Sequence, residues 1–159
     1  MNIIKYWKRN FLICELILSV ITVLLIILFI KIFKLELDLI NSLYDIRLQM
    51  YGTISGISGA LLGFVITALS ILLTLTDNEA LKTLKKSPFF PQAYKVFLNT
   101  SQFLALTTIV SLFGLAIDKD CEPRIWVSYL IMWSIIVSLF RLARCFWVLE
   151  NMIVLKLKD

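Results

Sequence analysis

Residues 53–76 read TISGISGALLGFVITALSILLTLT and contain no charged side chain in 24 positions. A helix needs roughly 17–25 apolar residues to cross a bilayer core about 30 Å thick, so this segment is long enough to span a membrane. Three further apolar segments reach a similar length, at about 11–33, 100–117 and 125–149. The pattern therefore predicts four transmembrane helices.

The composition indicates the same class of protein. Hydrophobic residues make up 60% of the 159 positions and charged residues 17%, whereas an average soluble domain is about 45–50% apolar and about 25% charged. A soluble chain of this length cannot bury so much apolar surface, because its surface-to-volume ratio is too high. We expect an all-α, polytopic integral membrane protein in which residues 1–159 form a single transmembrane domain.

The distribution of basic residues predicts the orientation. Eleven Lys and Arg lie in the N-terminal tail, in 77–99 and near the C-terminus, and five lie in the other two connections. Because basic residues are enriched on the cytoplasmic side, both termini are expected inside, in a bacterial inner membrane. Aromatic residues near the outer interface would form a belt there: Tyr44, Tyr51, Trp126 and Tyr129.

Two connections have helical patterns of their own. Residues 36–51 carry apolar positions at steps of three and four and are interpreted as an outer interfacial helix. Residues 77–99 would project into the cytosol as a helical hairpin, with its turn at Pro88 and Pro91.

Small and weakly polar residues form one stripe along 53–76. Four of the five glycines belong to it, and the positions recur at steps of four and three. Such a surface lets helices approach closely in a membrane, within one chain or between chains. The alternative is that the stripe lines an oligomeric pore. Its members are Gly52, Gly56, Gly59, Gly63, Thr67, Ser70 and Thr74.

The third span carries a shorter stripe of the same kind, formed by Thr107, Ser111 and Gly114. It predicts that the second and third spans pack together as an antiparallel hairpin.

Three charges lie inside the predicted spans at similar depth. Glu15 is near the cytoplasmic start of the first span, and Arg141 and Arg144 are near the cytoplasmic end of the fourth, on one helix face. An acid and an Arg at one depth reduce each other's desolvation cost, and charges within a membrane are candidates for function. Either Glu15 pairs with one of the arginines, or all three side chains reach the headgroups.

The cytosolic hairpin combines basic and aromatic residues. Lys82, Lys85 and Lys86 would be attracted to anionic lipid by about 1 kcal/mol each. With Phe89 and Phe90 as apolar anchors, the same segment is also a candidate docking site for a soluble cytoplasmic partner.

Several function classes are excluded or disfavoured by the sequence. The chain has no His, which excludes His-dependent catalytic triads and His metal sites. The three cysteines share no spacing motif, and no cofactor or metal site is expected. A net charge of +5, dispersed along the chain, does not indicate nucleic acid as a direct partner. No pair of ionisable groups suits acid–base catalysis, so an enzyme is not expected.

One part of the chain resembles a known class of proteins. It comprises Tyr51-Gly52, the segment ITALSIL at 66–72, the segment LKTLKK at 81–86 and the aromatic turn that follows. In this order it resembles small four-span membrane proteins of bacterial phage-exclusion systems, the RexB-like proteins, and it is similar in size to the membrane subunit of the Kiwa defence system. The resemblance implies an inner-membrane protein that conducts ions or disturbs the membrane potential during infection.

Three hypotheses follow. The first is a homo-oligomeric, pore-forming effector of anti-phage defence, with the second span at its axis. The second is a non-conducting membrane scaffold or sensor that recruits a soluble effector, and the third is a holin-like lysis protein.

Overall fold

The computed structural model describes residues 3–74, 89–118 and 124–157, and these ranges are helical apart from short turns. The helices, in chain order, are α1 (Ile3–Ile32), α2 (Glu36–Leu43), α3 (Arg47–Thr74), α5 (Phe89–Ile117) and α6 (Ile125–Leu157). The all-α prediction is therefore confirmed for the described part of the chain.

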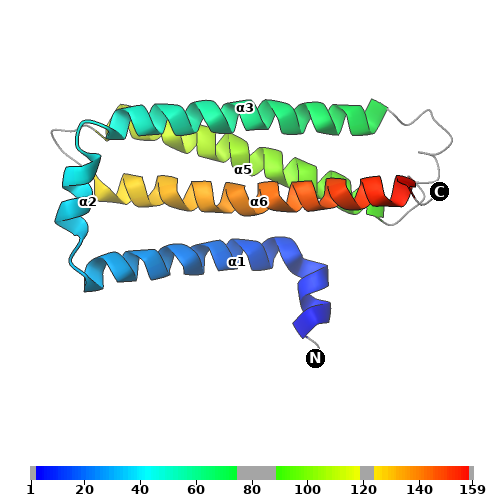
Figure 1. The fold of residues 1–159 in the computed structure, drawn as a ribbon, viewed down its shortest axis with the longest axis horizontal. Coiled ribbons are helices and arrows are strands. Elements are labelled where there is room, and N and C mark those ends of the chain that lie inside the picture. The colour runs from blue at the N-terminus through cyan, green and yellow to red at the C-terminus, as the bar shows by residue number, and fades with distance from the viewer. Residues whose placement is uncertain (1–2, 75–88, 119–123, 158–159) are drawn as a thin grey trace.

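The long helices form a bundle with α1 at one side. Helix α5 packs against both α3 and α6, and α1 packs mainly against α6 (Figure 1). The short α2 lies across one end of the bundle, where it links α1 to α3, and α1 begins and α6 ends at the opposite end. Both termini therefore belong to one end of the bundle.

Four helices are long and apolar enough to cross a membrane, which fits a multi-pass membrane protein. The candidate spans are Leu12–Ile32, Arg47–Ile71, Phe90–Ile117 and Ile125–Glu150. The second and third begin earlier than the sequence predicts, because α3 and α5 run unbroken through positions that had been assigned to connections. Residues 89–99 of the expected hairpin thus belong to α5, and 77–88 lie outside the described residues.

The predicted interfacial helix over 36–51 is shorter than expected. Helix α2 covers only its first half, and the chain turns before α3 begins at Arg47. The breaks are marked by Lys34 and Asp45, which have left-handed backbone angles, with φ of 52° and 67°. Asp adopts this conformation more readily than most residues, and with the extended backbone of Tyr44 before it, Asp45 separates α2 from α3.

The interior of the bundle is partly polar. Ser58 Oγ lies 2.9 Å from Thr108 Oγ1 between α3 and α5, and Thr107 donates to the carbonyl oxygen of Ser134 on α6 at 3.0 Å. Such bonds between helices replace the water that a bilayer core lacks. The hydroxyls therefore help to fix which helix faces meet.

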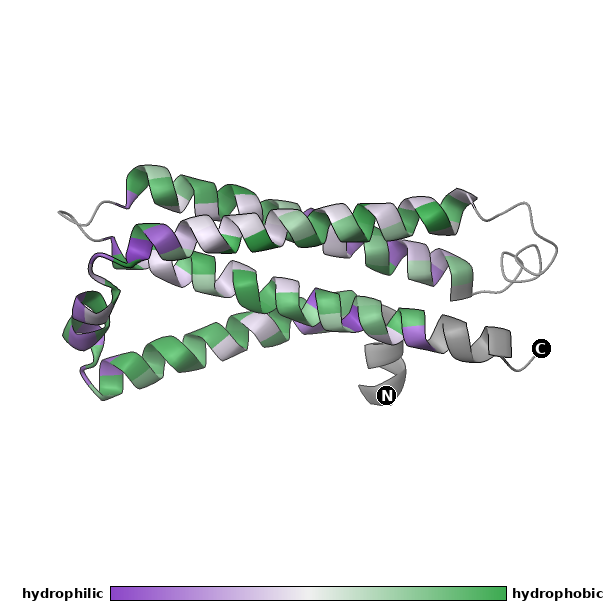
Figure 2. Ribbon diagram, turned by 45° about the horizontal axis from the view of Figure 1, so that its top comes forward, coloured by the Kyte–Doolittle hydropathy of each residue, from purple (hydrophilic) through white to green (hydrophobic). Residues whose placement is uncertain are grey.

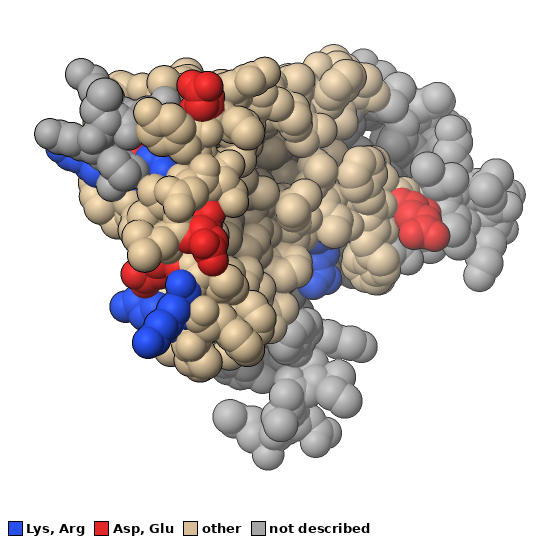
Figure 3. All heavy atoms as spheres, turned by 60° about the vertical axis from the view of Figure 1, so that its left-hand side comes forward, with Lys and Arg blue, Asp and Glu red and all other residues tan. Residues whose placement is uncertain are grey.

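The exterior is largely apolar. Long aliphatic and aromatic side chains such as Phe64, Phe113 and Leu139 are more than half exposed, and the ribbon coloured by hydropathy is mostly green along the spans (Figure 2). On the face shown in Figure 3, acidic and basic side chains gather chiefly at the end that carries α2 and leave a wide uncharged surface beside them. This distribution suits a bundle surrounded by lipid.

Packing between α5 and its neighbours generates a prediction. A Cβ atom at Gly114 would lie 2.6 Å from Ile131 Cδ1 and 3.1 Å from Tyr51 Cδ2. Gly114→Leu is therefore expected to lower the free energy of unfolding by about 1–3 kcal/mol through overpacking, measured by thermal unfolding in detergent.

Gly63→Leu is the matched control. A Cβ at Gly63 meets nothing within 4 Å, and both variants gain the same helix propensity. Equal losses of stability in the two variants would contradict this packing.

Candidate functional site

Glu15, Arg141 and Arg144 form one ion-paired group between α1 and α6, which we term the Glu15 cluster. Arg141 Nη1 donates to Glu15 Oε2 at 3.0 Å, and Arg144 donates to Glu15 Oε1 through Nε at 2.7 Å and also through Nη2. Arg141 Nη2 donates in addition to the carbonyl oxygen of Leu12 at 2.6 Å. Of the two alternatives for these charges, the structure contains the pair.

Helix periodicity places each member of the Glu15 cluster. Glu15 shares a buried face of α1 with Ser19 and Val23, one turn apart. On α6, Arg141 follows Ser134 and Val137 on the buried face at helical spacing. Both helices therefore direct these side chains toward each other near the end where the chain begins and ends.

Arg141 also contacts α5. Its Cζ atom lies 5.2 Å from the ring centroid of Phe103, a distance typical of a cation–π interaction, and Thr100 Oγ1 donates to the carbonyl oxygen of Arg141 at 3.2 Å. Only 2% of Arg141 is exposed. This residue thus connects α1 and α5 through α6.

The cluster holds two guanidinium groups and one carboxylate. Removing one partner of a buried pair leaves an uncompensated charge and costs about 3–5 kcal/mol. Arg144 is the more accessible arginine, with 24% of its side chain exposed, and it lies over the ring of Trp147. The ion pairs of this group therefore join α1 to α6.

The stripe on α3 faces away from the rest of the chain. Gly56, Gly63 and the three hydroxyl residues are exposed, whereas Gly52 and Gly59 are half-buried at the edge of the helix contact. A Cβ atom added at any of the four glycines meets nothing within 4 Å. The hydroxyl residues, each of which donates to a carbonyl oxygen of its own helix, are Thr67, Ser70 and Thr74.

Helices α3 and α5 do pack together, but through other residues than the stripe. The buried side of α3 carries Tyr51, Ser55, Ser58 and Val65. The shorter stripe on α5 faces α6 in part, since Thr107 bonds to both Ser134 and Ser138 there. The predicted pairing of the second and third spans is confirmed, and a small-residue pattern alone does not say which neighbour it meets.

A second polar group, which the sequence did not reveal, lies at the α2 end of the bundle. We term it the Asp118 cluster. Arg47 Nη1 lies 3.4 Å from Asp118 Oδ1, and Tyr51 donates to Asp118 Oδ2 at 2.8 Å. The Tyr51 hydroxyl is also 2.7 Å from Ser128 Oγ, and the backbone N–H of Arg124 donates to Asp118 at 2.8 Å.

The Asp118 cluster joins α3, the end of α5 and the start of α6. Tyr51 and Asp118 are fully buried, with 0% exposed, so Tyr51 faces the interior of the bundle and not its surface. One signal was available: Arg47 and Tyr51 are four residues apart on one helix face, and Asp118 directly follows an apolar span.

The remaining predicted site residues belong to the expected cytosolic hairpin. Lys82, Lys85 and Lys86 lie outside the described residues, Phe89 begins α5, and Phe90 is half-buried. Among the described residues, no three His, Cys, Asp or Glu side chains are grouped so that they could hold a metal ion.

No protein-family model, curated protein or solved structure matches the chain. We therefore infer function from the geometry of the structure, chiefly from that of the α3 stripe.

The Glu15 cluster generates a prediction about stability. Glu15→Gln is expected to destabilise the protein by about 3–5 kcal/mol, because the buried guanidinium group of Arg141 then loses the carboxylate that accepts from it. In a double-mutant cycle with Arg141→Gln, the coupling energy from unfolding in detergent is expected to be about 1–3 kcal/mol.

Glu150→Gln serves as the control, since Glu150 is an exposed acid on α6. A coupling energy near zero for Glu15 and Arg141, or an equal effect of the Glu150 change, would contradict the role of the pair.

Proposed function

We propose that the protein is a homo-oligomeric membrane protein that perturbs the membrane by conducting ions, with the α3 stripes of neighbouring chains facing one another. The observation that supports this most directly is the outward position of the glycines on α3. A glycine inside a helix is less favourable than alanine by about 1 kcal/mol, and among the described residues of one chain these four glycines make no close approach that would require them.

Gly114 shows the contrast. It lies where α5 approaches α3 and α6, and a side chain there would overlap with Ile131 and Tyr51. Close approach within the chain thus explains Gly114, and close approach of a second chain would explain Gly56, Gly59 and Gly63 in the same way.

The hydroxyls of the stripe add to the argument for conduction. Several buried hydroxyl residues of the spans bond to a neighbouring helix, as Ser58 and Thr107 do. Thr67, Ser70 and Thr74 instead donate only within α3 in the contacts described, so the lone pairs of their oxygen atoms are left to accept hydrogen bonds. Around a common axis these residues would present oxygen atoms to water and ions.

A path between chains also agrees with the packing inside one chain. The centre of the bundle is filled by side chains such as Phe97, Leu104 and Ile131. The cavity beside Ser58 and Ser138 measures about 170 Å³ and is lined mainly by aliphatic residues of α3, α5 and α6. Ions would therefore pass along an axis shared by several chains.

The orientation and setting belong to the same proposal. Both termini lie at one end of the bundle, and the distribution of Lys and Arg favours the cytoplasmic side of a bacterial inner membrane for that end. A role in phage defence, and a soluble cytoplasmic partner, remain predictions from the sequence resemblance and from residues 77–88.

The proposal is tested by measuring membrane potential in bacteria with a voltage-sensitive dye. Expression of the protein is expected to depolarise the membrane, and Gly59→Leu or Gly63→Leu is expected to abolish this, because the added side chains keep neighbouring α3 helices apart. Both variants should retain the helical content of the unsubstituted protein, since their Cβ atoms meet nothing within 4 Å among the described residues.

Ala116→Leu is the matched control, because it adds the same bulk to an exposed small residue of α5. It should depolarise the membrane as the unsubstituted protein does. Depolarisation that persists in both glycine variants, or an unchanged potential on expression of the unsubstituted protein with and without phage infection, would refute the proposal.

A further inference from the structure

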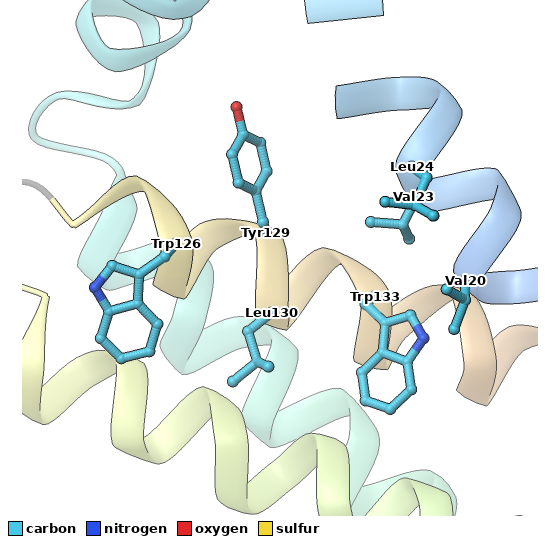
Figure 4. Close-up of a pocket in the computed structure, with 7 residues that line it drawn as sticks. All are labelled: Val20, Val23, Leu24, Trp126, Tyr129, Leu130 and Trp133. Atoms are coloured by element: carbon cyan, nitrogen blue, oxygen red, sulfur yellow. The ribbon is translucent and has the colours of Figure 1, made fainter. Parts of the chain in front are cut away.

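A groove separates α1 from α6 at the α2 end of the bundle. The two helices meet at the Glu15 cluster and diverge toward α2 in both views (Figures 1 and 2). The groove measures about 350 Å³, within the range of about 300–1,000 Å³ that is usual for ligand pockets. Its walls are Val20, Val23 and Leu24 on one side and Trp126, Tyr129 and Trp133 on the other (Figure 4).

We propose that this groove binds one acyl chain of a membrane phospholipid, with the ester group of that lipid near Tyr129. First, the groove opens to the apolar interior of the membrane. Both walls belong to candidate membrane spans, and Leu24 and Trp126 are more than half exposed. An apolar space of this kind offers water almost no hydrogen-bond partners, whereas an acyl chain fills it without a desolvation penalty.

The second argument is the depth of the aromatic residues. Trp126, Tyr129 and Trp133 follow the start of α6 by one, four and eight residues, which corresponds to roughly 1.5, 6 and 12 Å along the helix. The interfacial layer on each side of the hydrocarbon core is about 5–7 Å thick. Tyr129 would therefore lie at the level of the ester groups, and Trp133 beside the upper part of an acyl chain.

The third argument is an unused hydrogen-bonding capacity. Tyr129 Oη and Trp133 Nε1 are buried, and neither has a hydrogen-bond partner among the described residues. Both can donate, and the indole can only donate. Ester carbonyl oxygens accept without donating, so a small rotation of the Tyr129 ring would pair the ester of a lipid that enters the groove with a donor of α6. In Figure 4 the indole nitrogen is on the side of Trp133 that faces Val20.

The test measures lipid retained by the full chain. After delipidation by detergent exchange, the protein is incubated with dioleoyl phosphatidylglycerol and examined by native mass spectrometry. One lipid per chain is expected. Leu24→Trp fills the groove and should lower the retained fraction about tenfold or more. Tyr129→Phe removes only the hydroxyl and should lower it about three- to tenfold.

Leu25→Trp is the matched control, because Leu25 is an exposed neighbour on α1 outside the groove. It should retain lipid as the unsubstituted protein does, and thermal unfolding verifies that all three variants fold. Absence of retained lipid in the unsubstituted protein, or equal loss in the Leu24 and Leu25 variants, would overturn the proposal. A second copy of the chain seated in the groove would also overturn it. Such a copy would be detected as disulfide-linked dimers of a Val20→Cys variant that carries no other cysteine.

Discussion

Polar groups inside apolar helices have no water to bind in a bilayer, and this constraint organises the whole bundle. Charged partners meet at two places, at the Glu15 cluster between α1 and α6 and at the Asp118 cluster where α3, α5 and α6 come together. Between these ends, hydroxyls such as Ser58 and Thr107 bond across the helix contacts. Apolar packing alone would tolerate many rotations of each helix, whereas these bonds select one.

The α3 stripe lies outside these contacts between helices, and in our proposal it links the fold to assembly. Its glycines and hydroxyls are on the outer side of a helix whose inner side is already occupied by Tyr51, Ser58 and Val65. Small residues favour close helix contacts in membranes through packing and backbone proximity. An assembly built on this stripe would leave α1 at the periphery, where its groove beside α6 remains open to lipid. The two proposals thus use different faces of one bundle.

The sequence predicts some of these features well because they depend on one helix at a time. Four spans follow from apolar length, and the proximity of Glu15 to Arg141 follows from their equal depth. Features that depend on several helices were missed. A tyrosine near the start of a span is typical of the membrane interface. The contact between Tyr51 and Asp118 depends on where α5 ends relative to α3. The end of α2 was not predicted either, because Asp45 adopts a left-handed angle without a glycine or proline to signal it.

The central claim is that the α3 stripe faces other chains around an aqueous axis, and spin labels on α3 test it directly. Labels at Thr67 and Ser70 are compared with a label at Phe64, which is 73% exposed outside the stripe, for collision with oxygen and with a water-soluble paramagnetic reagent in vesicles. The account predicts that Thr67 and Ser70 are shielded from oxygen and reached by the water-soluble reagent, whereas Phe64 shows the reverse. High oxygen accessibility at all three positions would show that the stripe faces lipid and would contradict the account.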